Sequence, residues 1–134
     1  MTAELVPPQP PPPTILVVED ELTVRRMACR MVRGLGFEVA EAGDGREALR
    51  LIRQRETPFA LVLTDVVMPV MDGLELSRVL STERPGQAVL CMSAYPTTTL
   101  AGHHLLPERP FIRKPFLPAA LSAAIREAMT GPGA

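Results

Sequence analysis

Three short apolar segments each end in a polar group, and this feature constrains the fold more than any other in the chain. They are Ile15–Val18 before Glu19 and Asp20, Leu61–Thr64 before Asp65, and Ala88–Met92 before Ser93. Short, continuously apolar runs that alternate with helical patterns predict parallel strands buried on both faces. Ligands bind such sheets beyond the carboxyl ends of the strands. We therefore expect the three polar ends to share one site.

The rest of the chain alternates between helical and strand patterns. Apolar residues recur at helical spacing around residues 24–35, 48–52, 74–80 and 121–128, and weaker or shorter strands are predicted at 37–40 and 111–113. Residues 96–110 contain Pro107, Pro110 and three consecutive threonines, so any helix there should be short or irregular. The pattern predicts an α/β fold, a doubly wound parallel sheet of five strands in the order 2-1-3-4-5 with five helices.

The length of 134 residues predicts one domain, which we place at 14–130. Residues 1–13 end in a proline-rich run, which favours an extended tail or linker over a packed element. That run could also serve as a PxxP ligand for a partner, although a stiff spacer is the more ordinary role. Residues 131–134 are predicted to be a disordered tail, and we expect any output domain to lie on another chain.

Composition and charge exclude several classes of function. A net charge of −1, a pI near 6.1 and scattered arginines argue against a nucleic-acid surface. No leader pattern or long apolar span is found, so a cytoplasmic location without membrane contact is expected by elimination. Cys29 and Cys91 form no metal-binding spacing and should be reduced, buried thiols.

The residues that follow the strands suggest a specific chemistry. Strands one and three are neighbours in this order, so Glu19, Asp20 and Asp65 should crowd one crevice, and three close carboxylates favour a hard cation such as Mg²⁺. Lys114 is the only lysine beside thirteen arginines, as if its position requires a compact ammonium group. Together with the Ser93 hydroxyl, this set fits phosphoryl transfer to a carboxylate.

Several motifs built on these residues agree in sequence and spacing with a known family. They are ILVVEDE at 15–21, LVLTDVVMP at 61–69, MDG at 71–73, MSAY at 92–95 and KPF at 114–116. From about Thr14 to Met129 the chain resembles a response-regulator receiver domain of two-component signalling, most like the receivers attached to hybrid sensor histidine kinases. The resemblance implies a flavodoxin-like fold.

The resemblance also implies roles for individual residues. Asp65 matches the phosphoacceptor, and the Mg²⁺ ligands match Glu19, Asp20, Asp65 and the backbone carbonyl of Val67. Lys114 and Ser93 match the groups that contact the phosphoryl oxygens, and Ser93 and Phe111 match the switch pair. A cis peptide bond is expected between Lys114 and Pro115. The phosphodonor would be a phosphohistidine on a sensor histidine kinase or a histidine phosphotransfer protein.

Two other functions stay open on sequence grounds. One is an aspartyl-phosphate phosphatase, which usually needs a second carboxylate two residues after the nucleophile, where this chain has Val67. The other is a pseudo-receiver that binds a partner without being phosphorylated. We expect no enzyme activity beyond self-phosphorylation and self-dephosphorylation. The self-dephosphorylation should be slow, because Val67 and Tyr95 flank the approach of the water molecule that hydrolyses the phosphoaspartate. The domain should be a monomer.

Four further polar residues are better explained by structure than by chemistry. Asp44 and Asp72 each precede a glycine and fit turn formation. His103 and His104 are adjacent, so their side chains point to different sides, and no third ligand lies nearby in the sequence. We therefore expect the two histidines to be exposed and not to bind metal.

Overall fold

The structure is a computed structural model that describes residues 12–130. The predicted spacer at 1–13 lies outside the described residues except for Pro12 and Pro13, and the predicted tail at 131–134 lies wholly outside them. The Pro13 carbonyl accepts a hydrogen bond from the Glu38 N–H at 3.0 Å, so the described part of the chain begins beside a strand of the sheet.

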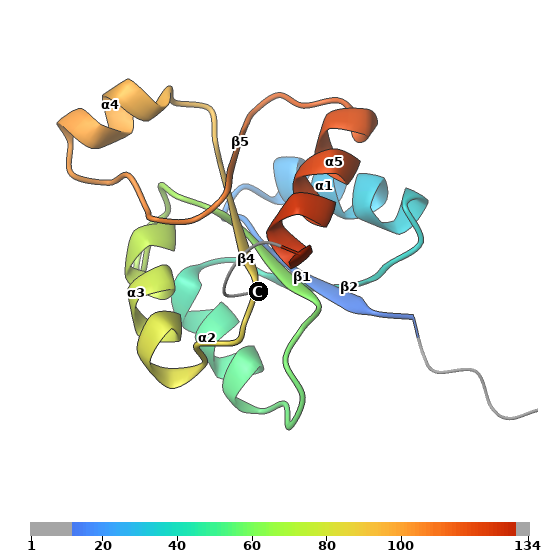
Figure 1. Ribbon diagram of the computed structural model, residues 1–134. Coiled ribbons are helices and arrows are strands. Elements are labelled where there is room, and N and C mark those ends of the chain that lie inside the picture. Colours follow the sequence, from blue (N-terminus) through green and yellow to red (C-terminus); the bar gives the residue numbers. More distant parts are fainter. Residues whose placement is uncertain (1–11, 131–134) are drawn as a thin grey trace, which may run out of the picture.

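Five strands and five helices alternate along the chain (Figure 1). The strands are β1 (Thr14–Val18), β2 (Glu38–Ala42), β3 (Leu61–Asp65), β4 (Val89–Ser93) and β5 (Phe111–Arg113). The helices are α1 (Leu22–Gly34), α2 (Gly45–Arg53), α3 (Gly73–Glu83), α4 (Thr97–Gly102) and α5 (Pro118–Thr130). All pairings are parallel and the order is β2-β1-β3-β4-β5, which confirms the predicted fold.

Alternating residues of the central strands feed two separate hydrophobic cores, because successive side chains of a strand point to opposite faces. Ile15 and Val17 of β1 pack with α1 and α5 on one face, whereas Leu16 and Val18 pack with α2 and α3 on the other. Figure 1 shows α1 and α5 together on one side of the sheet and α2 and α3 on the opposite side. This coverage explains why β1, β3 and β4 are apolar without alternation. Within residues 12–130, the helices are too short or too polar to span a lipid bilayer.

Some details depart from the sequence expectations. The second strand lies at Glu38–Ala42, not at 37–40, since it pairs with the whole of β1. Met27 belongs to the apolar pattern at 24–35 that predicted a core-facing helix side, but its side chain is 54% exposed at the rim of a hollow beside α1. The helix expected to be short or irregular is α4, which has only six residues.

Gly73 positions the backbone that follows β3. A Cβ atom at Gly73 would lie 2.3 Å from the Asp65 carbonyl oxygen and 2.9 Å from the Val66 Cα, and the Gly73 N–H donates to the Val66 carbonyl at 2.8 Å. We predict that Gly73→Ala lowers the free energy of unfolding by about 1–3 kcal/mol, the usual range for overpacking. Urea denaturation would measure this loss. Gly86→Ala is the control, because a Cβ there meets nothing within 4 Å, and equal losses in both variants would contradict the steric explanation.

Candidate functional site

The predicted acidic residues meet at the carboxyl edge of the sheet. Val18 of β1 pairs with Thr64 of β3, so the residues that follow each strand emerge side by side. Carboxylate oxygens of Glu19, Asp20 and Asp65 all lie within 4.8 Å of one another. Glu19 is 2% exposed and Asp65 7%, whereas Asp20 is exposed. The site is therefore a charged crevice with one open side.

Lys114 reaches this cluster from the other end of the sequence. It follows β5, and its Nζ donates to Glu19 Oε1 at 2.7 Å and to Asp65 Oδ2 at 2.9 Å. Burial alone would lower the pKa of Lys114, but its hydrogen bonds to Glu19 and Asp65 raise the pKa above the ordinary value of 10.5. The group is therefore a permanent cation at neutral pH. The Lys114–Pro115 peptide bond is cis, which confirms the prediction.

Asp20 stands where the crevice opens to solvent. Partial desolvation raises the pKa of its carboxyl above 3.8, and the neighbouring Glu19 carboxyl raises it further. Asp20 could in principle have served as the cap of α1, but the N-cap residue is Glu21 and no side-chain cap bond is made. Instead, Glu19 Oε2 accepts a hydrogen bond from the Glu21 N–H at 3.2 Å. Asp20 thus faces the cluster without a structural role in the helix.

Arg25 supports the acidic loop, a role that the sequence analysis missed. Its Nη1 donates to the Glu19 carbonyl oxygen at 2.9 Å and its Nε to Glu41 Oε1 at 2.9 Å. The Arg25 side chain is only 18% exposed, because it reaches from the first turn of α1 across to β2, and helical spacing does not report such a reach. An arginine one turn into the helix after an acidic pair is the only sequence signal of this contact.

The remaining predicted site residues lie on β4, on β5 and after β3. Ser93, at the end of β4, is fully buried, and its Oγ accepts a hydrogen bond from the Tyr95 N–H at 3.0 Å. Phe111 is partly buried against the core on the α2–α3 face. The Val67 side chain, two residues after Asp65, is 40% exposed. The structure brings the three acids together and Lys114 into contact with Glu19 and Asp65, and Ser93 is joined to this group through the backbone, since the Lys114 N–H donates to the Ser93 carbonyl oxygen at 2.9 Å.

The residues expected to play no part in catalysis lie as predicted. Asp44 and Asp72 cap α2 and α3 by accepting hydrogen bonds from the N–H groups of Glu47 and Glu75. His103 and His104 are both exposed. Cys29 and Cys91 are free and buried, and burial raises the pKa of these thiols to about 11 and about 12. They are therefore protonated and unreactive at neutral pH.

The donor set suits a hard divalent cation. Three carboxylates and one ammonium group leave a formal charge of −2 in a small volume, which favours the binding of a cation. All the side-chain donors are oxygens, and the exposed side at Asp20 leaves room for water, as Mg²⁺ requires. The residues present fit a magnesium site held by Glu19, Asp20 and Asp65.

A doubly wound sheet with acids and a lysine at its carboxyl edge defines a class of phosphate-handling α/β domain. The sequence matches the response regulator receiver domain family over residues 15–126, and the chain belongs to that family. It is therefore a receiver domain of two-component signalling, a class that works as a phosphorylation switch.

Named relatives and solved structures agree with this assignment. The chain is 35% identical over 117 residues to the sensor kinase CckA of Brucella abortus, covering 85% of this chain and 12% of the kinase. It is 33% identical over 112 residues to the DNA-binding response regulator MtrA of Mycobacterium tuberculosis strain H37Rv, covering 84% of this chain and 48% of MtrA. The chain thus spans about half the length of MtrA and a small part of CckA.

Solved receiver structures superimpose over most of the chain. The receiver domain of the hybrid histidine kinase CckA gives a TM-score of 0.71 at 32% identity and covers 87% of this chain and 99% of that one. A response regulator receiver domain protein from Clostridium thermocellum gives a TM-score of 0.75 at 26% identity, with coverage of 87% and 94%.

Proposed function

We propose that this domain is a phosphoaspartate switch that accepts a phosphoryl group on Asp65 from a phosphohistidine, with Mg²⁺ at the acidic cluster. The observation that best supports this proposal is the hydrogen bond from Lys114 Nζ to Asp65 Oδ2 at 2.9 Å, beside the carboxylates of two further residues. In such an arrangement, the carboxylate that would act as the nucleophile lies beside an ammonium group and beside oxygen atoms that could bind a hard metal ion. The receiver family assignment supports the same reaction.

In the proposed reaction, a carboxylate oxygen of Asp65 attacks the phosphorus of the donor phosphoimidazole. The new O–P bond forms as the P–N bond breaks, and the donor histidine keeps the electron pair and takes up a proton. When bound, Mg²⁺ neutralises charge on the transferred phosphoryl oxygens. Lys114 holds the Asp65 carboxylate in place before transfer and stabilises negative charge on the phosphoryl group afterwards.

The switch would pass through Ser93 and Phe111. The Ser93 hydroxyl is held by the Tyr95 N–H, so turning toward a phosphoryl oxygen exchanges one hydrogen bond for another. This turn would vacate space near the partly buried ring of Phe111. Phe111 has no hydroxyl, so its response would be a change in ring burial and not a new hydrogen bond.

The phosphodonor is proposed to be a sensor histidine kinase or a histidine phosphotransfer protein. An apolar hollow of about 460 Å³ lies between α1 and residues 114–116, which follow β5, and it is lined in part by Val24, Met27, Phe116 and Lys114. Because Lys114 borders both this hollow and the acidic cluster, a donor seated there would reach Asp65. The likeness to a sensor kinase supports this partner. A cytoplasmic monomer without nucleic-acid or membrane contact stays part of the proposal.

We also propose that the domain signals and does not turn over a separate substrate. The position two residues after Asp65, where an aspartyl phosphatase needs a second carboxylate, holds Val67. The intact acids and Lys114 argue against a scaffold that is never phosphorylated. Asp65 would therefore react once for each signalling event.

Acetyl phosphate with Mg²⁺ tests the proposal directly. We predict that intact-mass spectrometry detects one added phosphoryl group, and that removing Mg²⁺ with a chelator prevents the reaction. Asp20→Ala should raise the Mg²⁺ concentration for half-maximal phosphorylation by about tenfold or more, because a metal ligand is lost. Glu127→Ala, an exposed acid on α5, is the control. No mass shift in the wild type would defeat the proposal, and an unchanged Mg²⁺ requirement in Asp20→Ala would remove Asp20 from the site.

Slow self-dephosphorylation is a further prediction. Hydrolysis needs a water molecule in line with the phosphorus. Val67 follows Asp65 by two residues, and Val67 and Tyr95 line one hollow of about 220 Å³. Valine cannot orient that water, and the Tyr95 ring can cover its approach. Val67→Asn should accelerate loss of the phosphoryl group by up to about a hundredfold, as followed by mass spectrometry after removal of the donor. Decay within seconds in the wild type, or no change in Val67→Asn and Tyr95→Ala, would be inconsistent with this explanation.

A further inference from the structure

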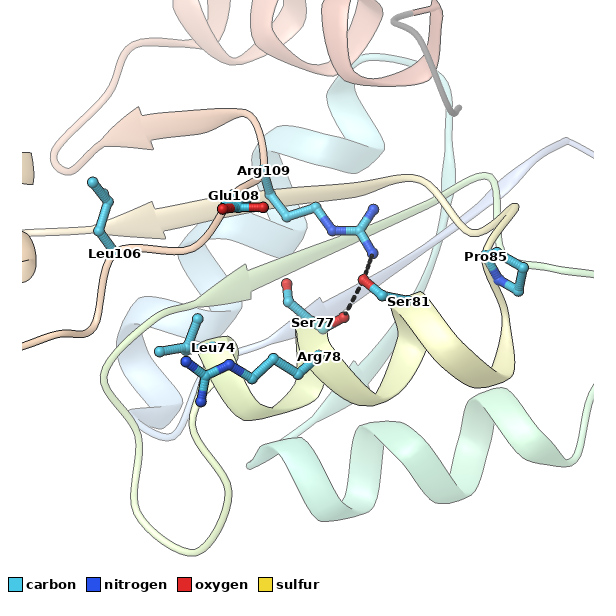
Figure 2. A pocket seen from close by; sticks show the side chains of 8 residues that line it. All are labelled: Leu74, Ser77, Arg78, Ser81, Pro85, Leu106, Glu108 and Arg109. Carbon is cyan, nitrogen blue, oxygen red and sulfur yellow. Dashed lines mark hydrogen bonds between the residues drawn. The ribbon is translucent and has the colours of Figure 1, made fainter.

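A third hollow lies on the α3 side of the sheet and shares no residue with the acidic cluster. Its volume is about 530 Å³, within the usual range of small-molecule sites. Residues of α3 form one wall and residues 106–109 form the other (Figure 2). The hollow exists because α4 ends at Gly102 and the following segment, with Pro107 and Pro110, returns to β5 without a further helix over this flank of α3.

The hollow contains a buried polar group whose hydrogen-bonding capacity is unused. Ser77 is 5% exposed, and its Oγ makes no hydrogen bond to an oxygen or nitrogen atom in the described part of the chain. The Ser77 hydroxyl faces the Cys91 sulfur and lowers the pKa of that thiol against the larger effect of burial, but sulfur is a weak acceptor. A buried hydroxyl without a partner is unfavourable, and a ligand that bonds to it removes that penalty. Figure 2 shows the Ser77 side chain between the guanidinium groups of Arg78 and Arg109 in this view.

The charge of the lining favours an anion. Arg78 and Arg109 carry two positive charges against the one negative charge of Glu108, which leaves a formal charge of +1. Arg109 is already positioned, since its Nη2 donates to Ser81 Oγ at 3.2 Å, and that hydroxyl donates to the Ser77 carbonyl oxygen at 2.9 Å (Figure 2). The guanidinium fork of an arginine has five donors, so Arg109 can hold a ligand while keeping the bond to Ser81.

We propose that this hollow binds a small monocarboxylic acid with an apolar body. The carboxylate would be held by Arg78 and Arg109 and would accept a hydrogen bond from the Ser77 hydroxyl. The apolar body would lie on Leu74 and Leu106, which line the same hollow. The single negative charge of the carboxylate matches the formal charge of +1 on the lining. The apolar body would contact the leucine side chains of the hollow, whereas inorganic phosphate has no apolar group to place there. The site does not depend on the phosphorylation of Asp65.

Phenylacetate and its neutral analogue phenylacetamide provide the probes. In amide-resolved NMR of the unphosphorylated chain, phenylacetate should shift signals of α3 and of residues 103–110 with a dissociation constant in the millimolar range or tighter. Phenylacetamide should bind about tenfold more weakly or not at all, because it lacks the charge. Ser77→Ala should weaken phenylacetate binding severalfold without lowering the unfolding temperature, since the hydroxyl has only a weak contact with the Cys91 sulfur in the free domain.

Paired variants separate a specific site from general attraction. Arg78→Gln/Arg109→Gln should weaken binding by about tenfold or more. Arg46→Gln/Arg126→Gln removes the same charge from exposed positions on α2 and α5 and should bind as the wild type does. The proposal is overturned if phenylacetate leaves the signals of α3 and 103–110 unchanged in the wild type, if phenylacetamide binds equally well, or if both double variants lose binding equally.

Discussion

Asp65→Asn is expected to abolish phosphorylation by acetyl phosphate while leaving the domain folded. Asparagine has nearly the shape of aspartate, but its amide cannot act as a nucleophile toward phosphorus at neutral pH. Glu19 and Asp20 lie close by, yet Glu19 is 2% exposed and engaged by Lys114, and Asp20 follows β1 and not β3, at the solvent side of the crevice. We therefore expect no other acid to substitute for Asp65.

A matched control for this substitution is Asp72→Asn. Asp72 caps α3, and asparagine caps helices about as well as aspartate does, so the fold should be kept. Intact-mass spectrometry should detect a phosphoryl group on the wild type and on Asp72→Asn, and none on Asp65→Asn. A phosphoryl group on Asp65→Asn in an amount similar to that on the wild type would show that another residue is the acceptor.

Lys114→Met is expected to destabilise the unliganded domain by about 3–5 kcal/mol, the usual cost of removing one partner of a buried ion pair. Methionine keeps most of the apolar stem, so the loss would come from the charge and not from a cavity. Lys114 contacts two buried carboxylates, Glu19 and Asp65, which would then repel each other without compensation. Urea denaturation in the presence of a metal chelator would measure this effect.

The pH dependence of that loss follows from the raised pKa of Lys114. Because the folded-state pKa lies above 10.5, the stabilising contribution is fully present below pH 10.5 and is lost only as the pH rises through the folded value. The difference between the wild type and Lys114→Met should therefore be the same at about pH 7 and about pH 9.

Two further variants test the origin of the effect. Adding Asp65→Asn to Lys114→Met should recover part of the stability by removing one unpaired charge. Arg53→Ala breaks an ion pair with Glu83 between exposed side chains and should change stability far less. Equal losses in Lys114→Met and Arg53→Ala would show that burial does not determine the strength of these pairs.

Sequence reasoning predicted the site better than its surroundings. Glu19, Asp65 and Lys114 could be placed together because each ends or follows a parallel strand, and the carboxyl ends of such strands meet at one edge. The hydrogen bond from Lys114 to Glu19 could not be predicted, since the reach of a side chain across a sheet leaves no periodic signal. Arg25 was hidden for the same reason, because helical spacing reports a face of α1 and not the contacts at its end.

The hollow beside α3 illustrates a second limit. Prolines predicted that the segment 96–110 would interrupt a helix, and α4 is indeed short. They could not predict the path of residues 103–110, because loops without periodicity are positioned by the tertiary contacts that they happen to make. The unpaired hydroxyl of Ser77 follows from that path and not from any feature of α3 alone.

The contact between Lys114 and Glu19 joins residues that are 95 positions apart in the chain. Contacts between distant residues close a long loop, and they require most of the intervening structure to be in place. A nascent or truncated chain that lacks β5 would contain Asp65 but not the cation that completes its surroundings. Competence for signalling would thus arrive only with the fifth strand of this domain, which makes the reaction itself a check that the whole sheet is in place.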